Sequence, residues 1–187
     1  MFRDFALVII TFLLFTSCTF VRKYQKNKPF VYKNNIVLNI DNVTPDDKVI
    51  IKSRLSTQLD DSSKVKIKDV AFILHYIDRP PSFDTLASRR SADNMQTSMV
   101  NLGFYSARST FSYAVDSQVH KRQYRVTTTY QVYAGRRTLI DTFAYLLNKP
   151  ELQQLALDTK SQSPLQKGSP ITKAAISSEE NRLVDLY

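Results

Sequence analysis

The sequence predicts an α+β protein in which a β-α-α-β-β unit is followed by a second unit of the same order that ends after its helices. Apolar residues alternate with polar ones in some stretches and recur every three or four residues in others, as strands and helices require. The aromatic share of 11%, with ten Tyr and eleven Phe, favours strands. The order strand, helix, helix then starts again after Gly135. We therefore expect two tandem units, the second truncated, behind an N-terminal signal and a basic tether.

Composition excludes several classes of protein. The 187 residues are 43% hydrophobic and 23% charged, as in ordinary globular domains, and the single cysteine excludes a disulfide-stapled scaffold. The residues Cys18, His75 and His120 are scattered, so we expect neither a metal site nor a cofactor. The sequence has no phosphate-binding glycine loop and no nucleophile elbow. A hydrolase would have to assemble Ser, Asp and His from unrelated segments, so we expect no catalytic residues and no enzyme.

The first 17 residues are typical of a secretory signal. Arg3 precedes the ten-residue apolar run 6–15, which has the length of a signal h-region. Two small residues then precede Cys18, and this arrangement resembles a bacterial lipobox, in which the cysteine thiol is acylated. We therefore expect residues 1–17 to be a signal peptide and Cys18 to be the lipid attachment site. Two alternatives stay open: the uncharged stretch 5–21 could span a bilayer uncleaved, or Cys18 could follow an ordinary signal-peptidase site.

The net charge of +9 is concentrated directly behind this signal. Residues 19–35 contain five basic and no acidic side chains, and so carry more than half of the excess. A basic segment beside an apolar one suits an anionic membrane surface, and no nucleic-acid-binding module is visible, so we expect no nucleic acid as partner. Three asparagines and Pro29 break any periodicity. We therefore expect 18–35 to be an irregular, lipid-anchored tether that reaches about 55 Å when extended.

The first unit is expected to begin with a strand over 36–40 and a helix. Thr44 has the position of a helix N-cap and Pro45 that of the first helical residue, so the helix is predicted to run to about Leu59. Residues 64–78 alternate lysines with apolar residues and then become continuously apolar, which favours an extended segment.

A second helix is predicted over 87–102, followed by a hairpin of two strands. Gly103 stands where a left-handed residue commonly ends a helix. The stretches 111–115 and 124–132 alternate apolar with polar residues on either side of a polar loop, and the pattern of 124–132 is typical of a strand with one buried face. The core-facing stripe of the helix is expected to consist of Ala92, Met95, Met99 and Leu102.

The second unit repeats only the beginning of this order. We expect a strand over 138–147, a helix over 150–157 and a helix over 172–187, with Ile176 and Tyr187 on the same face of the last helix as Leu183. A layer with one strand cannot cover two helices, so we interpret the segment as a repeat cut short. The expected boundaries are 1–17 for the signal, 18–35 for the tether, 36–135 for the first unit and 136–187 for the incomplete second unit.

This order of elements behind an export signal resembles the polypeptide-transport-associated (POTRA) domains of the BamA/TamA superfamily of outer-membrane assembly factors. The predicted lipid-type Cys18 narrows the resemblance to the N-terminal POTRA part of such a factor in a lipoprotein of Gram-negative bacteria. One departure from the family is Phe104, where tyrosine is commoner. The motifs that carry the resemblance are Asn101-Leu-Gly-Phe-Tyr105, Tyr130-Gln-Val-Tyr-Ala-Gly135, Thr138-Leu-Ile-Asp141 through Tyr145, and Leu165-Gln-Lys-Gly-Ser-Pro170 with Glu180 and Arg182-Leu183.

The resemblance implies a non-enzymatic module that binds unfolded or nascent outer-membrane proteins by strand addition, with other assembly subunits as further partners. It also implies a place at the outer membrane, held by the lipid anchor and facing the periplasm. We expect Phe111, Tyr113 and Val115 to lie on the strand edge that receives the client. The alternative that stays open is a self-contained lipid-anchored envelope binding or adaptor protein. The residues expected to define turns of the fold are Gly103, Phe104, Tyr105 and Gly135.

Overall fold

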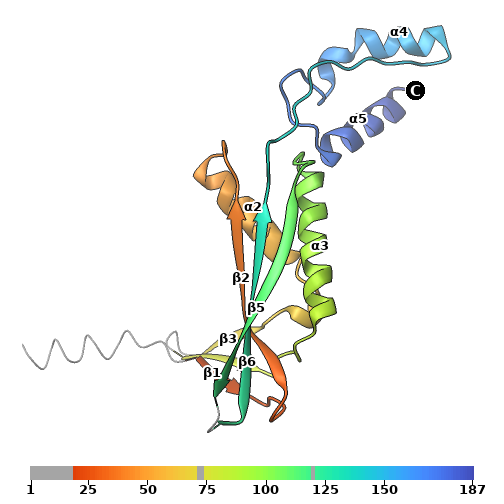
Figure 1. The fold of residues 1–187 in the computed structure, drawn as a ribbon. Helices are drawn as coiled ribbons and strands as arrows, with labels where there is room; N and C mark the ends of the chain where they lie inside the picture. The colour runs from red at the N-terminus through yellow and green to blue at the C-terminus, as the bar shows by residue number, and fades with distance from the viewer. Residues whose placement is uncertain (1–18, 71–73, 119–120) are drawn as a thin grey trace, which may run out of the picture. The chain divides into compact units, whose positions relative to one another are not determined.

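The computed structural model of the chain describes residues 19–70, 74–118 and 121–187 (Figure 1). The expected signal peptide 1–17 and lipid attachment site Cys18 lie outside these residues, as does His120. The described chain has a mixed α+β structure with two three-stranded sheets. It divides into two compact units. The described residues of one unit are 19–35, 60–70, 74–88, 111–118 and 121–129, and those of the other are 36–59, 89–110 and 130–187.

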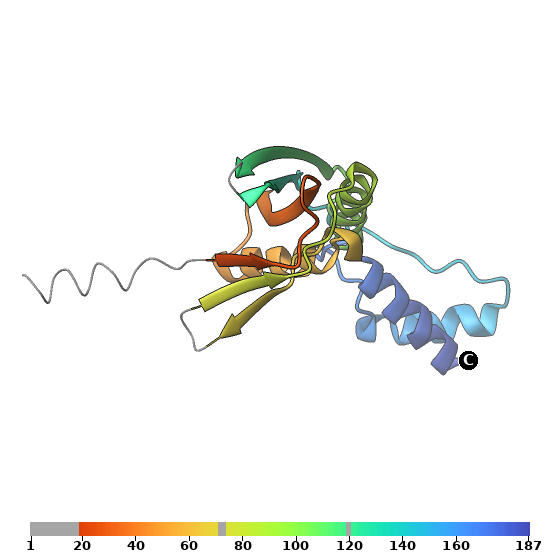
Figure 2. The same cartoon turned by 90° about the horizontal axis from the view of Figure 1, so that it is seen from below.

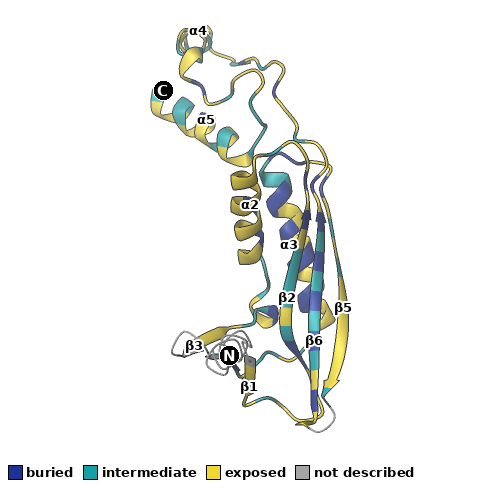
Figure 3. Cartoon of the chain, turned by 90° about the vertical axis from the view of Figure 1, so that its left-hand side faces the viewer, coloured by how far each residue is buried: buried dark blue, intermediate teal, exposed yellow. Residues whose placement is uncertain are grey.

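The larger sheet contains β2 (Pro29–Asn39), β6 (Gln123–Tyr133) and β5 (Arg108–Gln118), in that order. The arrows of β2 and β6 run the same way in Figure 1, and that of β5 runs the opposite way, as expected of the hairpin partner of β6. Figure 3 shows that buried residues alternate along β6, whereas β5 is largely exposed. This alternation confirms the period-two prediction, and the buried residues include Val126, Thr128, Tyr130 and Val132.

Helix α2 (Pro45–Thr57) begins as the sequence predicts. Thr44 is its N-cap, and the Thr44 hydroxyl oxygen accepts a hydrogen bond from the Asp47 backbone N–H over 3.1 Å. The helix buries Ile51 and Leu55. It ends two residues before the expected Leu59, which is half-buried.

Helix α3 (Thr85–Asn101) confirms the predicted second helix and most of its core stripe. The side chains of Ala92, Met95 and Met99 are buried, and Leu102 is half-buried after the helix end. Gly103 has a φ of +92°, and its N–H donates to the Val100 carbonyl over 2.9 Å. A Cβ at position 103 would come within 2.9 Å of the Ile171 carbonyl oxygen, so the position requires glycine both for its backbone and for its surroundings.

The expectation of an irregular tether over 18–35 is wrong for residues 19–22 and 29–35, which form strands, whereas residues 23–28 between them are irregular. Residues Thr19–Arg22 form strand β1, which pairs in parallel with β4 (Leu74–Asp78), and β4 pairs antiparallel with β3 (Ile67–Val70). The larger sheet then begins at Pro29, seven residues before the strand predicted at Ile36. Phe30 and Val31 are both buried although they are adjacent, so the segment has no period of two for the sequence to reveal.

The strand predicted over 138–147 does not form. The segment makes an isolated bridge between Leu139 and Pro170, with the Ile140 N–H donating to the Ser169 carbonyl over 2.8 Å. Leu146 is 93% exposed. Among the described residues, the backbone partners of this segment are the short turn at 168–171 and the Gly103 carbonyl, which accepts from the Thr138 N–H over 2.9 Å, and they reach only residues 138–140.

Two helices follow, close to their predicted bounds: α4 (Pro150–Asp158) and α5 (Lys173–Leu186). The apolar face expected on α5 is not buried, because Ile176 and Tyr187 are exposed and Leu183 is only half-buried. The buried residue of this helix is instead the charged Glu179.

Candidate functional site

Strand β5 is an edge of the larger sheet, since its neighbour among the described strands is β6. Tyr113 and Val115 expose 51% and 50% of their surface, and Phe111 is half-buried. These are the three residues that the sequence predicts for strand addition. The structure places them at alternate positions of one edge strand, and side chains at such positions share a face.

The opposite edge of the sheet, β2, is covered at its beginning by a neighbouring segment. The Val31 N–H donates to the Pro81 carbonyl over 2.9 Å, and the Phe83 N–H donates to the Pro29 carbonyl over 3.0 Å. Between these two bonds, Phe30 and Ser82 form an antiparallel bridge. The backbone groups of this part of β2 are therefore already used, and β5 is the better candidate for an added strand.

The sequence of β5 has none of the usual protection of an edge strand. Residues 109–115 contain no charge, no proline and no glycine, and the flanking charges are Arg108 and Asp116. Edge strands of soluble proteins are commonly blunted by lysine, proline or a bulge, because unpaired backbone groups otherwise recruit another chain. An uncharged, exposed edge of this length suits pairing with an extended segment.

Side chains hold β5 at two points. The Gln96 side-chain oxygen accepts a hydrogen bond from the Ser109 N–H over 3.2 Å. The rings of Phe83 and Tyr113 lie 4.6 Å apart between centroids, tilted by 49°. The aromatic contact fixes the Tyr113 ring on the strand while half of its surface remains exposed, so the ring is available to a second apolar group.

The four residues predicted to define turns lie around the ends of α3 and β6. Gly135 has a φ of +69°, and a Cβ there would overlap the Ser106 hydroxyl oxygen. Phe104 is buried, and the Arg137 guanidinium carbon lies 4.8 Å from the centroid of its ring. Tyr105 remains 49% exposed. Gly103, Gly135 and Phe104 therefore shape the backbone and the core, and Gly135 also lines a cavity of about 660 Å³ together with Arg136 and Arg137.

A buried polar cluster joins α5 to the segment before α4, and sequence analysis missed its central residue. The Tyr145 hydroxyl donates to Glu179 Oε1 over 2.6 Å. Arg182 donates through Nε to Glu179 Oε2 over 3.0 Å and through its second terminal nitrogen to Glu179 Oε1 over 2.7 Å. The resemblance singled out Glu180, which is exposed, whereas the structure buries Glu179. The spacing of Glu179 and Arg182, three residues apart on a helix, is the signal that could have found the pair.

The electrostatics of this cluster are those of a satisfied structural ion pair. Hydrogen bonds from Arg182 lower the pKa of the Glu179 carboxyl to about 2, against the opposing effect of burial. Burial and the hydrogen bond to Glu179 raise the pKa of Tyr145. The Arg182 guanidinium also donates to the Thr159 hydroxyl over 3.0 Å. Each charged group already has partners, so we interpret the cluster as a structural contact that holds α5 in place.

The described residues contain no group of three His, Cys, Asp or Glu side chains that could hold a metal ion. Among the described helices, none has the length and apolar character needed to cross a membrane.

Comparisons with known proteins find likeness among solved structures. No protein-family model matches the chain, and no curated protein matches it. Among solved structures, the chain is similar to the crystal structure of Haemophilus influenzae BamA POTRA3-5, with a TM-score of 0.31 and 9% sequence identity. The match covers 86% of this chain and 87% of the BamA chain.

Proposed function

We propose that the chain is a POTRA-like, non-enzymatic module of an outer-membrane assembly factor, which holds an extended segment of a client protein against β5. The observation that carries the proposal is the uncharged, exposed edge formed by residues 109–115, in a sheet whose other edge is already paired at Phe30. Apart from the short strands β3 and β4, which lie between the two helices, the order of β2, α2, α3, β5 and β6 follows the strand, helix, helix, strand, strand order of the resemblance.

Strand addition explains how such a module handles many clients. Backbone N–H and C=O groups of the edge pair with those of the client, so affinity depends little on the client sequence. The exposed Tyr113 and Val115 add contacts to apolar side chains at alternate client positions. Unfolded outer-membrane proteins, whose strands alternate apolar and polar residues, offer this pattern.

The proposal also includes the location of the module. Acylation of Cys18 places the chain at the outer membrane, and the described residues face the periplasm, where unfolded clients arrive. Residues 136–187 act as the beginning of a second unit, and other assembly subunits are further partners.

The test uses the full chain in an uncharged detergent and a fluorescently labelled, unfolded outer-membrane β-barrel protein diluted from urea. Fluorescence anisotropy reports binding. The double variant Tyr113→Lys with Val115→Lys places charges on the edge and removes its exposed apolar side chains. We expect about tenfold weaker binding, equivalent to about 1.4 kcal/mol.

The matched control is Val49→Lys with Ile50→Lys on α2, which also exchanges two exposed apolar side chains for lysines. We expect this control to bind as the wild type does. Equal weakening in both variants would show that charge alone matters and would overturn the proposal. Unchanged binding by the β5 variant would favour a lipid-anchored adaptor that does not use this edge.

A photo-crosslinking amino acid gives a second, direct measurement. Placed at Tyr113, it is expected to form a covalent adduct with the unfolded client. Placed at Tyr187, which is 50% exposed, it is expected to form little adduct. Adducts of equal yield at both positions would contradict a specific role for β5.

A further inference from the structure

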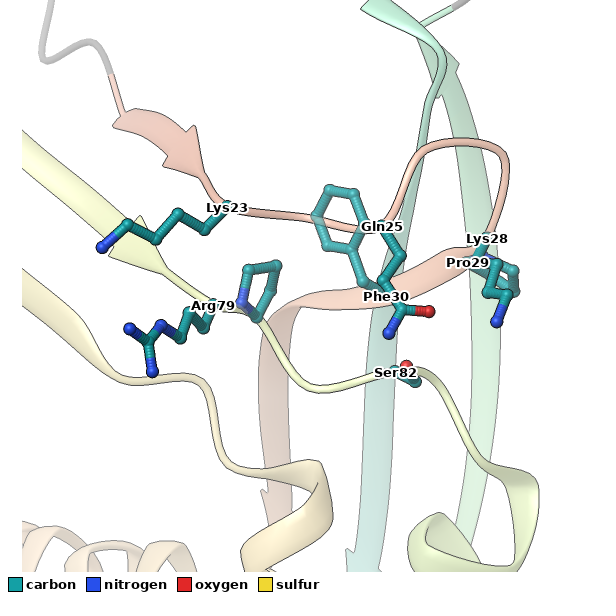
Figure 4. A pocket seen from close by; sticks show the side chains of 8 residues that line it. Lys23, Gln25, Lys28, Pro29, Phe30, Arg79 and Ser82 are labelled. Atoms are coloured by element: carbon teal, nitrogen blue, oxygen red, sulfur yellow. The ribbon is translucent and has the colours of Figure 1, made fainter.

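A small basic cavity lies where strands β1 and β4 end (Figure 4). Its volume is about 230 Å³, and its lining includes Lys23, Lys28 and Arg79 together with Gln25, Phe30 and Ser82. In the view of Figure 4, Lys23 and Arg79 lie on one side of Phe30 and Lys28 lies on the other. A water molecule takes about 30 Å³ of liquid volume, so the cavity has room for a hydrated phosphate group.

Two of these cations, Lys23 and Arg79, have an uncommon backbone conformation. Arg22 and Asp78 pair in the parallel ladder, and Lys23 and Arg79 directly follow them. Both are left-handed, with φ of +54° and +52°, although neither is a glycine. The Arg79 N–H donates to the Arg22 carbonyl over 3.0 Å, which fixes this turn to the ladder. Left-handed backbone at bulky residues is disfavoured, and it occurs here at two of the three cavity cations.

Two basic residues of this region that do not line the cavity contact aromatic rings. Arg22 lies over the Tyr76 ring at 5.7 Å and Arg125 over the Tyr32 ring at 4.7 Å, so these two have structural contacts. Lys23 has a long, exposed ion pair with Asp78 at 3.7 Å. Among the described residues, Lys28 and Arg79 have no ion-pair partner. All three cations line the cavity, so each of them attracts an anion that enters it.

The cavity lies close in sequence to the segment that is expected to anchor the chain to a membrane. Lys23 is five residues after Cys18, so even a fully extended chain separates them by at most about 18 Å. The paired strand β1 begins at Thr19, which removes the long tether that the sequence predicts. Any anchoring of the chain through residues 1–18 therefore keeps the cavity near the membrane headgroups.

We propose that this cavity binds a phosphate group, with Lys23, Lys28 and Arg79 supplying the positive charge. The side chains of Gln25 and Ser82 can donate further hydrogen bonds to phosphate oxygens. The same chemistry serves the phosphate diester of an anionic phospholipid and a soluble phosphate ester. This proposal does not depend on client binding at β5.

The test uses the isotopically labelled full chain in uncharged detergent micelles and follows the NMR signals of Gln25, Arg79 and Ser82. Phosphatidylglycerol, phosphatidylcholine and inorganic phosphate are added separately. We expect saturable shifts with phosphatidylglycerol. Shifts with inorganic phosphate at comparable concentration identify a site for soluble phosphate, and shifts with phosphatidylglycerol alone identify a headgroup site. An absence of saturable shifts with both phosphatidylglycerol and inorganic phosphate would overturn the proposal.

A pair of charge-removing variants decides whether the cavity is responsible. Arg79→Asn with Lys28→Gln removes two cavity cations, and asparagine tolerates the left-handed backbone at position 79. We expect about tenfold weaker binding of the phosphate probe, equivalent to about 1.4 kcal/mol. Lys48→Gln with Lys52→Gln removes two exposed cations from α2 and should leave binding unchanged.

Equal weakening in both pairs would indicate nonspecific charge attraction and would overturn the proposal. An unchanged backbone signal from the buried Ile77 shows that β4 is intact in the cavity variant. The β5 variant Tyr113→Lys with Val115→Lys should bind the phosphate probe at least as well as the wild type, which separates this proposal from the proposed function.

Discussion

The hydroxyl of Tyr145 donates a 2.6 Å hydrogen bond to Glu179 Oε1, linking the irregular segment before α4 to the middle of α5. The same hydroxyl oxygen accepts from Arg182 over 3.1 Å, so one phenol contacts both members of the ion pair. The segment that failed to form a strand is thus held to the last helix by side chains instead of by a backbone ladder.

This ion pair predicts a pH dependence of stability. The folded-state pKa of Glu179 is about 2, below its ordinary value of 4.5. A lowered carboxyl pKa stabilises the fold above pH 4.5, and this contribution is lost as the pH falls from about 4.5 to 2. We expect the free energy of unfolding of the wild type to exceed that of Glu179→Gln by a margin that is larger at pH 7 than at pH 2. The margin should change by on the order of 2–3 kcal/mol between the two pH values. Urea unfolding followed by circular dichroism measures the difference, and parallel pH curves would refute it.

Removing the Arg182 guanidinium should lower the free energy of unfolding more than removing an exposed cation does. Arg182→Leu leaves the buried Glu179 carboxylate without its charge partner, and we expect a loss of about 3 kcal/mol in unfolding free energy. The control is Lys64→Ala, which breaks the exposed 3.0 Å pair with Asp61 and should cost less than about 1 kcal/mol. A cost for Arg182→Leu as small as the control would mean that water already reaches the Glu179 carboxylate.

Alanine substitutions at two glycines distinguish the cost of backbone strain from the cost of steric overlap. Gly135 and Gly168 both have positive φ, but a Cβ at 135 would overlap Ser106 Oγ, whereas a Cβ at 168 meets nothing within 4 Å. We expect Gly168→Ala to cost about 1–2 kcal/mol for its backbone alone and Gly135→Ala to cost more. Adding Ser106→Ala to Gly135→Ala should recover the steric part. Thermal unfolding measures all three, and equal costs at the two glycines would contradict the overlap.

The methionines of α3 are predicted to be core residues. Met99 is fully buried, so Met99→Ala should cost about 2–5 kcal/mol in unfolding free energy. Leu86→Ala on the same helix removes a side chain that is 63% exposed and should cost far less. The same urea titration gives both values. Similar small costs would place Met99 at the surface in solution.

Local chemistry explains which parts of the fold could be predicted. The N-cap at Thr44 bonds to a residue three positions away, and the left-handed turn at Gly103 closes onto the helix directly before it. The alternation along β6 is visible in its own residues. These features depend on hydrogen bonds and periodicity within a few residues, so the sequence by itself determined them, including the uncharged character of 109–115.

Only the tertiary structure decided the features that depend on a distant partner. Thr19 pairs with His75, so a strand forms where we expected part of a tether. No pattern in the residues around Thr19 predicts that partner. The bridge between Phe30 and Ser82 covers the beginning of the opposite sheet edge, which makes β5 the better candidate for strand addition. Which of two adjacent glutamates is buried depended on where Arg182 and Tyr145 meet α5. The physical reason is that strand pairing and burial each require two segments in contact. The sequence of one segment specifies that segment's own surface but not the partner that covers it.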